Sequence, residues 1–226
     1  MTQEEYRKQL EKKQTEGYQL DIRLILLKAV QYFKASPLLF FAFSAMVLSL
    51  NLFSMRAQPL GSIITVFVQP ALMAGYYYVA DKIDHGQKIT FYDFFEGFNS
   101  WVNIFVGVVL AGLLVAGGLF LLIVPGLYLA VAYVFLLPFL VTARFSYWEA
   151  MEASRKLVTK NFLNILGLVA ALVLINFLGI MFFGVGILVS LPLSYLSIHA
   201  AFKTILNPTE EEFRKGPTKI DFSHFR

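Results

Sequence analysis

The longest stretch without a charged side chain limits this chain more than any other feature. Residues 97–143 are 47 consecutive residues without Asp, Glu, Lys or Arg. A single membrane-spanning helix needs roughly 20 apolar residues, so this run is long enough for two spans and a turn. Pro125 and Gly126 lie inside the run. Because proline fixes φ and glycine tolerates positive φ, the pair is typical of turns. The run therefore predicts a helical hairpin in a membrane, with its turn at Pro125 and Gly126.

Three further uncharged runs extend the prediction to six spans. Residues 35–55 and 57–80 are separated only by Arg56, and residues 161–202 have Gly184 near their middle. Of the 226 residues, 58% are hydrophobic and only 15% are charged, an apolar excess that a soluble domain does not need. We therefore expect an all-α, polytopic helical membrane bundle of six spans arranged in three hairpins.

Short amphipathic segments precede each predicted hairpin. Apolar residues recur at helical spacing in 21–35, 90–98 and 147–162, and each stripe is too short to cross a membrane. We expect these segments to form a collar at the inner leaflet, docked partly on the bundle and partly in the headgroup region of the membrane lipids. The residues predicted to be interfacial are Phe94, Phe95, Trp148 and Met151, and we expect Trp148 to be buried at this interface.

The distribution of basic residues predicts the orientation. In a six-span topology, 18 of the 19 Lys and Arg residues fall on one side and only Arg56 falls on the other. Basic residues are enriched in cytoplasmic loops, so both termini are expected in the cytoplasm and the protein in a bacterial inner membrane. The charged residues 1–20 and 206–226 are interpreted as solvated tails flanking a membrane domain at 21–205. No cleavable signal peptide is expected, because the first 20 residues lack an apolar segment.

Some polar residues lie within the predicted spans and could form a polar interior. They are Gln69, Asn176, Ser190, Ser194 and Ser197, and the three serines share one face of the last span. Two interpretations stay open. These groups form hydrogen bonds between helices, or they line a pathway for a neutral or zwitterionic solute.

Enzymatic chemistry is not indicated by any motif. The spans contain no group that titrates near neutrality except His199, whose simplest role is a hydrogen bond near the membrane surface. No metal-ligand spacing, nucleophile elbow or phosphate-binding loop is present, so we expect no enzyme activity, no metal and no cofactor. We favour a non-catalytic scaffold or accessory protein that acts through its cytoplasmic face. The alternative is a small-solute or lipid transporter that uses the polar interior. The expected partners are lipids and a second protein or another copy of the chain, but not nucleic acid.

Three motifs between residues 125 and 205 carry a resemblance to a known family. They are Pro-Gly-Leu-Tyr at 125–128, Trp-Glu-Ala-Met-Glu-Ala-Ser at 148–154 and Gly-Val-Gly at 184–186. In this order they resemble the uncharacterised bacterial multi-pass proteins that are related to the membrane domain of some glycerophosphodiester phosphodiesterases. The resemblance implies a helical membrane bundle. It does not imply phosphodiesterase activity, because the separate catalytic domain of the fused members has no counterpart in these 226 residues.

Overall fold

The computed structural model describes residues 1–181 and 185–206, and helices account for nearly all of them. Six segments are long and apolar enough to cross a membrane, which confirms the predicted all-α membrane protein. The helices are α1 (Gln3–Glu16), α2 (Ile22–Ala35), α3 (Pro37–Arg56), α4 (Leu60–Asp84), the 3-10 helix η1 (Phe91–Ser100), α5 (Trp101–Leu121), α6 (Ile123–Ala132), α7 (Leu136–Val141), α8 (Tyr147–Lys160), α9 (Phe162–Met181) and α10 (Ile187–Leu206).

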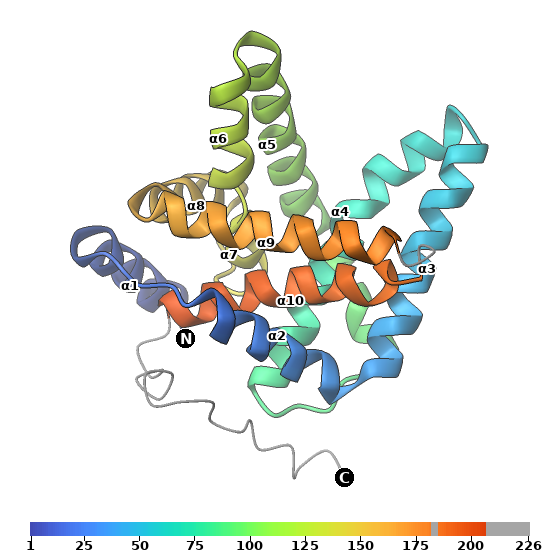
Figure 1. The fold of residues 1–226 in the computed structure, drawn as a ribbon, viewed down its shortest axis with the longest axis horizontal. Helices are drawn as coiled ribbons and strands as arrows, with labels where there is room; N and C mark the ends of the chain where they lie inside the picture. Colours follow the sequence, from blue (N-terminus) through green and yellow to red (C-terminus); the bar gives the residue numbers. More distant parts are fainter. Residues whose placement is uncertain (182–184, 207–226) are drawn as a thin grey trace.

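The three predicted hairpins diverge from a shared base (Figure 1). Helices α3 and α4, α5 and α6, and α9 and α10 form the hairpins, while α1, α2, η1 and α8 pack with the opposite ends of the spans to form the base. Large apolar side chains are exposed towards the hairpin tips, among them Phe53, Met55, Phe120, Leu121 and Phe177. Such a surface would associate in water, whereas hydrocarbon chains solvate it well. The tips are therefore suited to lipid and the base to a polar medium.

The turn between α5 and α6 differs from the predicted one. Leu122 joins the two helices in an extended conformation, with φ of −154° and ψ of 125°. Pro125 falls in the first turn of α6, where a missing N–H removes no hydrogen bond. A Cβ on Gly126 would lie 2.4 Å from the backbone nitrogen of Leu119. Gly126 therefore permits close packing of α5 on α6, and its role is not the positive φ of a turn.

The fourth span is broken rather than continuous. A turn at residues 133–135 separates α6 from α7. The buried hydroxyl of Ser154, on α8, donates to the carbonyl of Ala132 at 2.7 Å and accepts from the N–H of Phe135 at 3.1 Å. Backbone groups freed inside a membrane protein need such partners. Ser154 therefore stabilises the break and fastens α8 to the fourth span.

The predicted amphipathic segment at 90–98 forms η1, which packs closely against α4. A Cβ on Gly75 would lie 2.0 Å from the carbonyl oxygen of Phe94, so only glycine lets η1 approach α4 this closely. Phe94 is fully buried, with its ring 4.4 Å from that of Phe43. At the start of η1, Asp93 accepts the backbone N–H of Thr90 at 2.5 Å, as part of a capping box.

The prediction of a solvated tail at residues 1–20 is wrong. Helix α1 begins with a capping box in which Thr2 and Glu5 bond each other's backbone N–H groups. Tyr6 and Leu10 are buried, and the helix packs against α8 and α10. The other predicted tail, from residue 207 onward, and the turn at Gly184 lie outside the described residues.

Helix α2 also packs on protein. It lies along α10 and buries Ile25, Ala29 and Tyr32 (Figure 1). Lys28 is buried as well. The buried face therefore includes polar side chains, and the Tyr32 ring packs on that of His199, on α10, at 5.7 Å between centroids.

Candidate functional site

The predicted polar interior divides between two hairpins. Gln69 accepts a hydrogen bond from Asn51, on α3, at 3.3 Å. In the last hairpin, Asn176 donates to Ser194 at 2.6 Å and accepts from Ser190 at 3.0 Å. Ser197 is buried and donates to the carbonyl of Leu193 within its own helix. Each side chain is therefore satisfied within its hairpin, as expected for hydrogen bonds that hold helices together.

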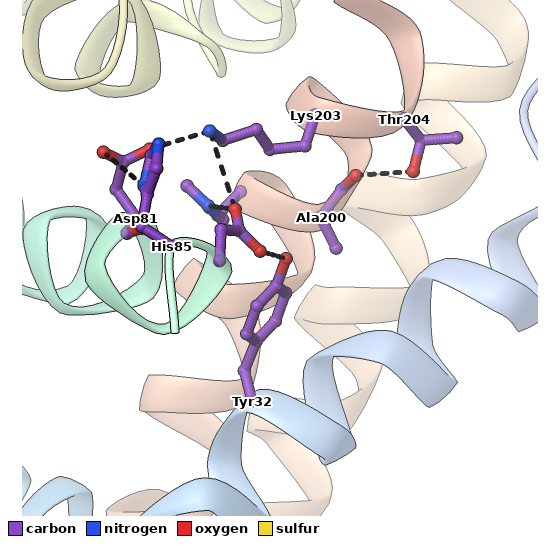
Figure 2. A network of polar contacts seen from close by, with 8 residues as sticks. Tyr32, Asp81, His85, Ala200, Lys203 and Thr204 are labelled. Carbon is purple, nitrogen blue, oxygen red and sulfur yellow. Dashed lines mark hydrogen bonds and ion pairs between the residues drawn. The ribbon is translucent and has the colours of Figure 1, made fainter. Parts of the chain in front are cut away.

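A denser polar cluster lies at the base, where α2, α4 and α10 meet (Figure 2). We call Tyr32, Asp81, Asp84, His199 and Lys203 the clamp. The Lys203 ammonium lies 2.7 Å from an Asp81 oxygen and 3.6 Å from an Asp84 oxygen. His199 Nε2 lies 2.9 Å from the same Asp84 oxygen, Oδ2. The Tyr32 hydroxyl donates to the other oxygen, Asp84 Oδ1.

Helical spacing places these groups opposite one another. Asp81 and Asp84 are three residues apart on the last turn of α4, so their carboxylates lie on neighbouring parts of one face. His199 and Lys203 are four residues apart on α10 and form the facing pair. Because a carboxylate only accepts, His199 Nε2 must carry the proton of its hydrogen bond to Asp84. The clamp thus ties three helices together through charged hydrogen bonds.

Because the charged groups of the clamp are largely removed from water, each one depends on its partner for stabilisation. His199 has no exposed surface, and Lys203 is 8% exposed. The Asp84 carboxylate is 19% exposed, although the end of α4 that carries it is open to solvent. His199 Nδ1 has no hydrogen-bond partner in the described part of the chain. Removal of one member would leave another charge buried without compensation, which is strongly destabilising.

The clamp also contains ligand atoms in an arrangement that a metal ion could use. One atom each from Asp81, Asp84 and His199 lie within 4.8 Å of one another. The Lys203 ammonium lies against both carboxylates, however, and supplies the positive charge that a cation would bring. The arrangement therefore fits a structural cluster, in which Lys203 takes the place of a cation, better than a resident metal.

A second lysine joins η1 to α4. Lys82 lies 2.6 Å from Asp93 and also binds Glu96. Consecutive residues on the last turn of α4 thus point to different neighbours, with Asp81 directed to α10 and Lys82 to η1. Lys82 and Lys203 are thus each held by a pair of carboxylates.

Helix α1 covers the clamp from outside. The Tyr6 ring packs on Phe202 at 5.9 Å between centroids, and burial raises the pKa of the Tyr6 hydroxyl. Arg7 binds Glu149 of α8 through two hydrogen bonds of 2.6 and 3.2 Å. Gln3 donates to the carbonyl of Arg144 at 2.9 Å. These contacts hold α1 across the junction of α8 and α10.

Beside the clamp lies a polar cleft of about 590 Å³, a volume within the range of small-molecule sites. It lies among the first turn of α1, the end of α4, η1 and the corner between α7 and α8. Its lining includes Thr2, Tyr78, Asp81, Lys82, Glu96 and Arg144. Asp81 belongs to both the cleft and the clamp. The cleft is therefore large enough to hold a small ligand.

The predicted interfacial residues have different environments. Phe94 and Met151 are buried in the protein, and Phe95 is partly buried. Trp148 is 65% exposed on the protein surface, so its burial at the lipid interface stays a prediction. Met151 lies three residues further along α8, a helix that packs against α5, α6 and α7.

The clamp and the cleft were missing from the sequence prediction. His199 was interpreted as an isolated hydrogen-bonding group, whereas its partner Asp84 lies 115 residues away. The available signal was the pair of spacings, Asp81 with Asp84 and His199 with Lys203, on helix ends that share the cytoplasmic side of the predicted topology. Comparison with family models, curated proteins and solved structures finds no match to this chain.

Proposed function

We propose that this chain is a non-catalytic scaffold or accessory protein of the bacterial inner membrane that acts through its base, which faces the cytoplasm. The supporting observation is the segregation of charge. All the described Lys and Arg residues except Arg56 lie in the base or in the ends of spans that form it. The described clamp, cleft and packed amphipathic helices lie there as well, whereas the tips expose apolar side chains.

Two features favour this function over transport. The polar side chains of the spans pair within single hairpins, which supports a structural role for them. The buried charges of the clamp lie where α4 and α10 end at the base, rather than midway along the spans. Proton- and ion-coupled transporters use charged groups inside the membrane. The family relationship to the membrane domains of glycerophosphodiester phosphodiesterases is also our proposal.

The orientation can be tested with single cysteines, because the chain contains none. Gln58 lies near the tip of the first hairpin, and Gln87 and Lys156 lie exposed at the base. We expect an impermeant thiol reagent to label a cysteine at 58 from the periplasm. Cysteines at 87 and 156 should react only after the membrane is opened. Labelling of position 156 in intact cells would contradict the orientation.

The working surface can be tested by photocrosslinking in cells. A photoreactive amino acid replaces Tyr92 or Trp148, both exposed at the base, or Phe120, exposed at a tip. We expect discrete protein adducts from 92 or 148 and lipid adducts alone from 120. Protein adducts confined to 120 would contradict a function at the base. A transport signal in proteoliposomes that Asn176→Ala abolishes would favour the alternative.

A further inference from the structure

One charged side chain of the cleft has no ion pair in the described part of the chain. Asp81 is paired with Lys203 and lies near His85, while Lys82 and Glu96 are paired with each other. Arg144 also lines the cleft and is exposed. Its guanidinium makes no ion pair or hydrogen bond with any other described residue, so its positive charge is available to a ligand.

The backbone of Arg144 is held in an unusual conformation. Its φ is +55°, the only positive φ of a residue other than glycine in the described chain. Residues other than glycine, asparagine and aspartate rarely adopt this region, and such strain is concentrated at functional sites. Buried Ala143 and Phe145 flank Arg144, and Gln3 bonds its carbonyl. These contacts fix the backbone of Arg144, although its side chain has no partner among the described residues.

We propose that the cleft binds a phosphodiester group, as carried by a phospholipid headgroup, with Arg144 as its charged ligand. This inference rests on the proposed function, because it assigns a ligand to the cytoplasmic face. Arginine pairs with phosphate oxygens through parallel hydrogen bonds. The hydroxyl of Tyr78 and the amide of Gln87 line the same cleft and have no side-chain hydrogen bond to another described residue. They provide further donors.

The surrounding carboxylates explain why the ligand carries a single charge. Lys82 and Lys203 are each held by two carboxylates, so the region beneath the cleft already has more negative than positive groups. A phosphate monoester carries a charge of about −1.5 to −2 at neutral pH, and a diester carries one negative charge. The Arg144 guanidinium balances the charge of a diester, whereas the second charge of a monoester would meet the repulsion of Asp81 and Glu96, which line the same cleft.

Binding can be measured with the purified full chain in a non-ionic detergent. The shift of the thermal unfolding midpoint with ligand concentration gives the apparent Kd. The probes are dihexanoyl phosphatidylglycerol, its water-soluble deacylated form glycerophosphoglycerol, and glycerol 3-phosphate as the monoester. In the first two, the phosphodiester is the only charge. The test variant is Arg144→Asn, because asparagine tolerates positive φ and the variant can retain the fold.

Arg155→Asn is the matched control. Arg155 is exposed on α8, is not part of the cleft lining, and makes no ion pair with another described residue. We expect the short-chain lipid to bind the natural chain and Arg155→Asn alike. Arg144→Asn should weaken binding at least about tenfold, the effect of one lost charge-assisted pair. The monoester should bind more weakly than either diester.

The three probes separate the source of the ligand from its chemistry. Tighter binding of the lipid than of glycerophosphoglycerol identifies a membrane lipid, and equal binding identifies a soluble diester at the same site. Equal loss in the Arg144 and Arg155 variants would overturn the proposal, as would preference for the monoester. If these results appear while crosslinks at Tyr92 or Trp148 persist, only the ligand assignment fails and the function at the base stands.

Discussion

The tips and the base of this protein are stabilised by different physical means. At the tips, helices touch within a hairpin but diverge between hairpins (Figure 1). Large apolar side chains such as Phe53 and Phe120 are exposed there. At the base, buried aromatic rings and charged groups link α1, α2, α4, η1, α8 and α10. Lipid can replace protein contacts at an apolar tip but cannot replace a lost partner in a buried ion pair. Stability should therefore depend on the base much more than on the tips.

The largest expected effect comes from breaking the clamp. Lys203→Met would leave the Asp81 and Asp84 carboxylates without their ammonium group. Removal of one partner from a buried pair lowers the free energy of unfolding by about 3–5 kcal/mol. Denaturation of the detergent-solubilised protein, followed by circular dichroism, measures the loss.

Two further variants sharpen this test. Lys156 pairs with Glu152 at 2.7 Å, but both side chains are nearly half exposed. Lys156→Met should therefore change stability by less than about 0.5 kcal/mol. Adding Asp81→Asn and Asp84→Asn to Lys203→Met should restore much of the loss, because no buried charge then lacks its partner. Equal effects of the two lysine variants would mean that the clamp is no more important than a surface pair.

The second prediction contrasts two glycines. A Cβ at Gly75 would collide with the Phe94 carbonyl, whereas nothing lies within 4 Å of a Cβ at Gly112, on the outer face of α5. Gly75→Ala should force η1 away from α4 and lower the unfolding free energy by about 3 kcal/mol, at the upper end of overpacking effects. Gly112→Ala should be neutral or slightly stabilising, because alanine favours a helix over glycine. Thermal unfolding of both variants is the measurement, and similar losses would remove the distinction between base and tip.

The tips were more predictable from sequence than the base, and the reason is the range of the contacts. Apolar runs and helical spacing are local signals, and they predicted the six spans, α2 and α8 close to their observed bounds. The division of α6 from α7 depends on Ser154, which is nineteen residues beyond Phe135, and no local pattern in the fourth span indicates it. The docking of α1 likewise depends on Glu149, 142 residues from Arg7.

The surfaces of α8 and η1 show the same limit. A helical wheel groups Trp148 with Met151, but only the packing of α8 on its neighbouring helices decides that Met151 is buried in the protein and Trp148 exposed. In η1, the phenylalanine spacing predicted a stripe, and that stripe is real. Its partner is α4 rather than lipid, because Gly75 and Gly97 permit a backbone approach that hydrophobicity alone does not reveal. Amphipathic periodicity thus indicates a buried face without indicating whether protein or lipid covers it.

A smaller effect is expected within the third hairpin. Replacing Ser190, Ser194 and Ser197 together with Ala removes two hydrogen bonds to Asn176 across the hairpin, and such bonds average about 0.6 kcal/mol each in membrane proteins, so the total loss should be about 1 kcal/mol. Ser49→Ala is the control, since its hydroxyl bonds only the carbonyl of Ala45 in its own helix. Unchanged stability together with loss of a lipid-exchange or transport signal would instead support a pathway through this hairpin.

The smallest effect has the opposite sign. Arg144 is held at φ of +55°, a conformation that costs residues other than glycine about 1 kcal/mol or more. Arg144→Gly should therefore raise the unfolding free energy by about 1 kcal/mol, less the greater entropy of glycine in the unfolded chain. Arg155→Gly, in the middle of α8, should instead lower it by about 1 kcal/mol. Chemical denaturation of the two variants side by side measures the difference. If Arg144→Gly destabilises as much as Arg155→Gly, the backbone of Arg144 is not strained. The positive φ would then no longer support a ligand-binding role for Arg144.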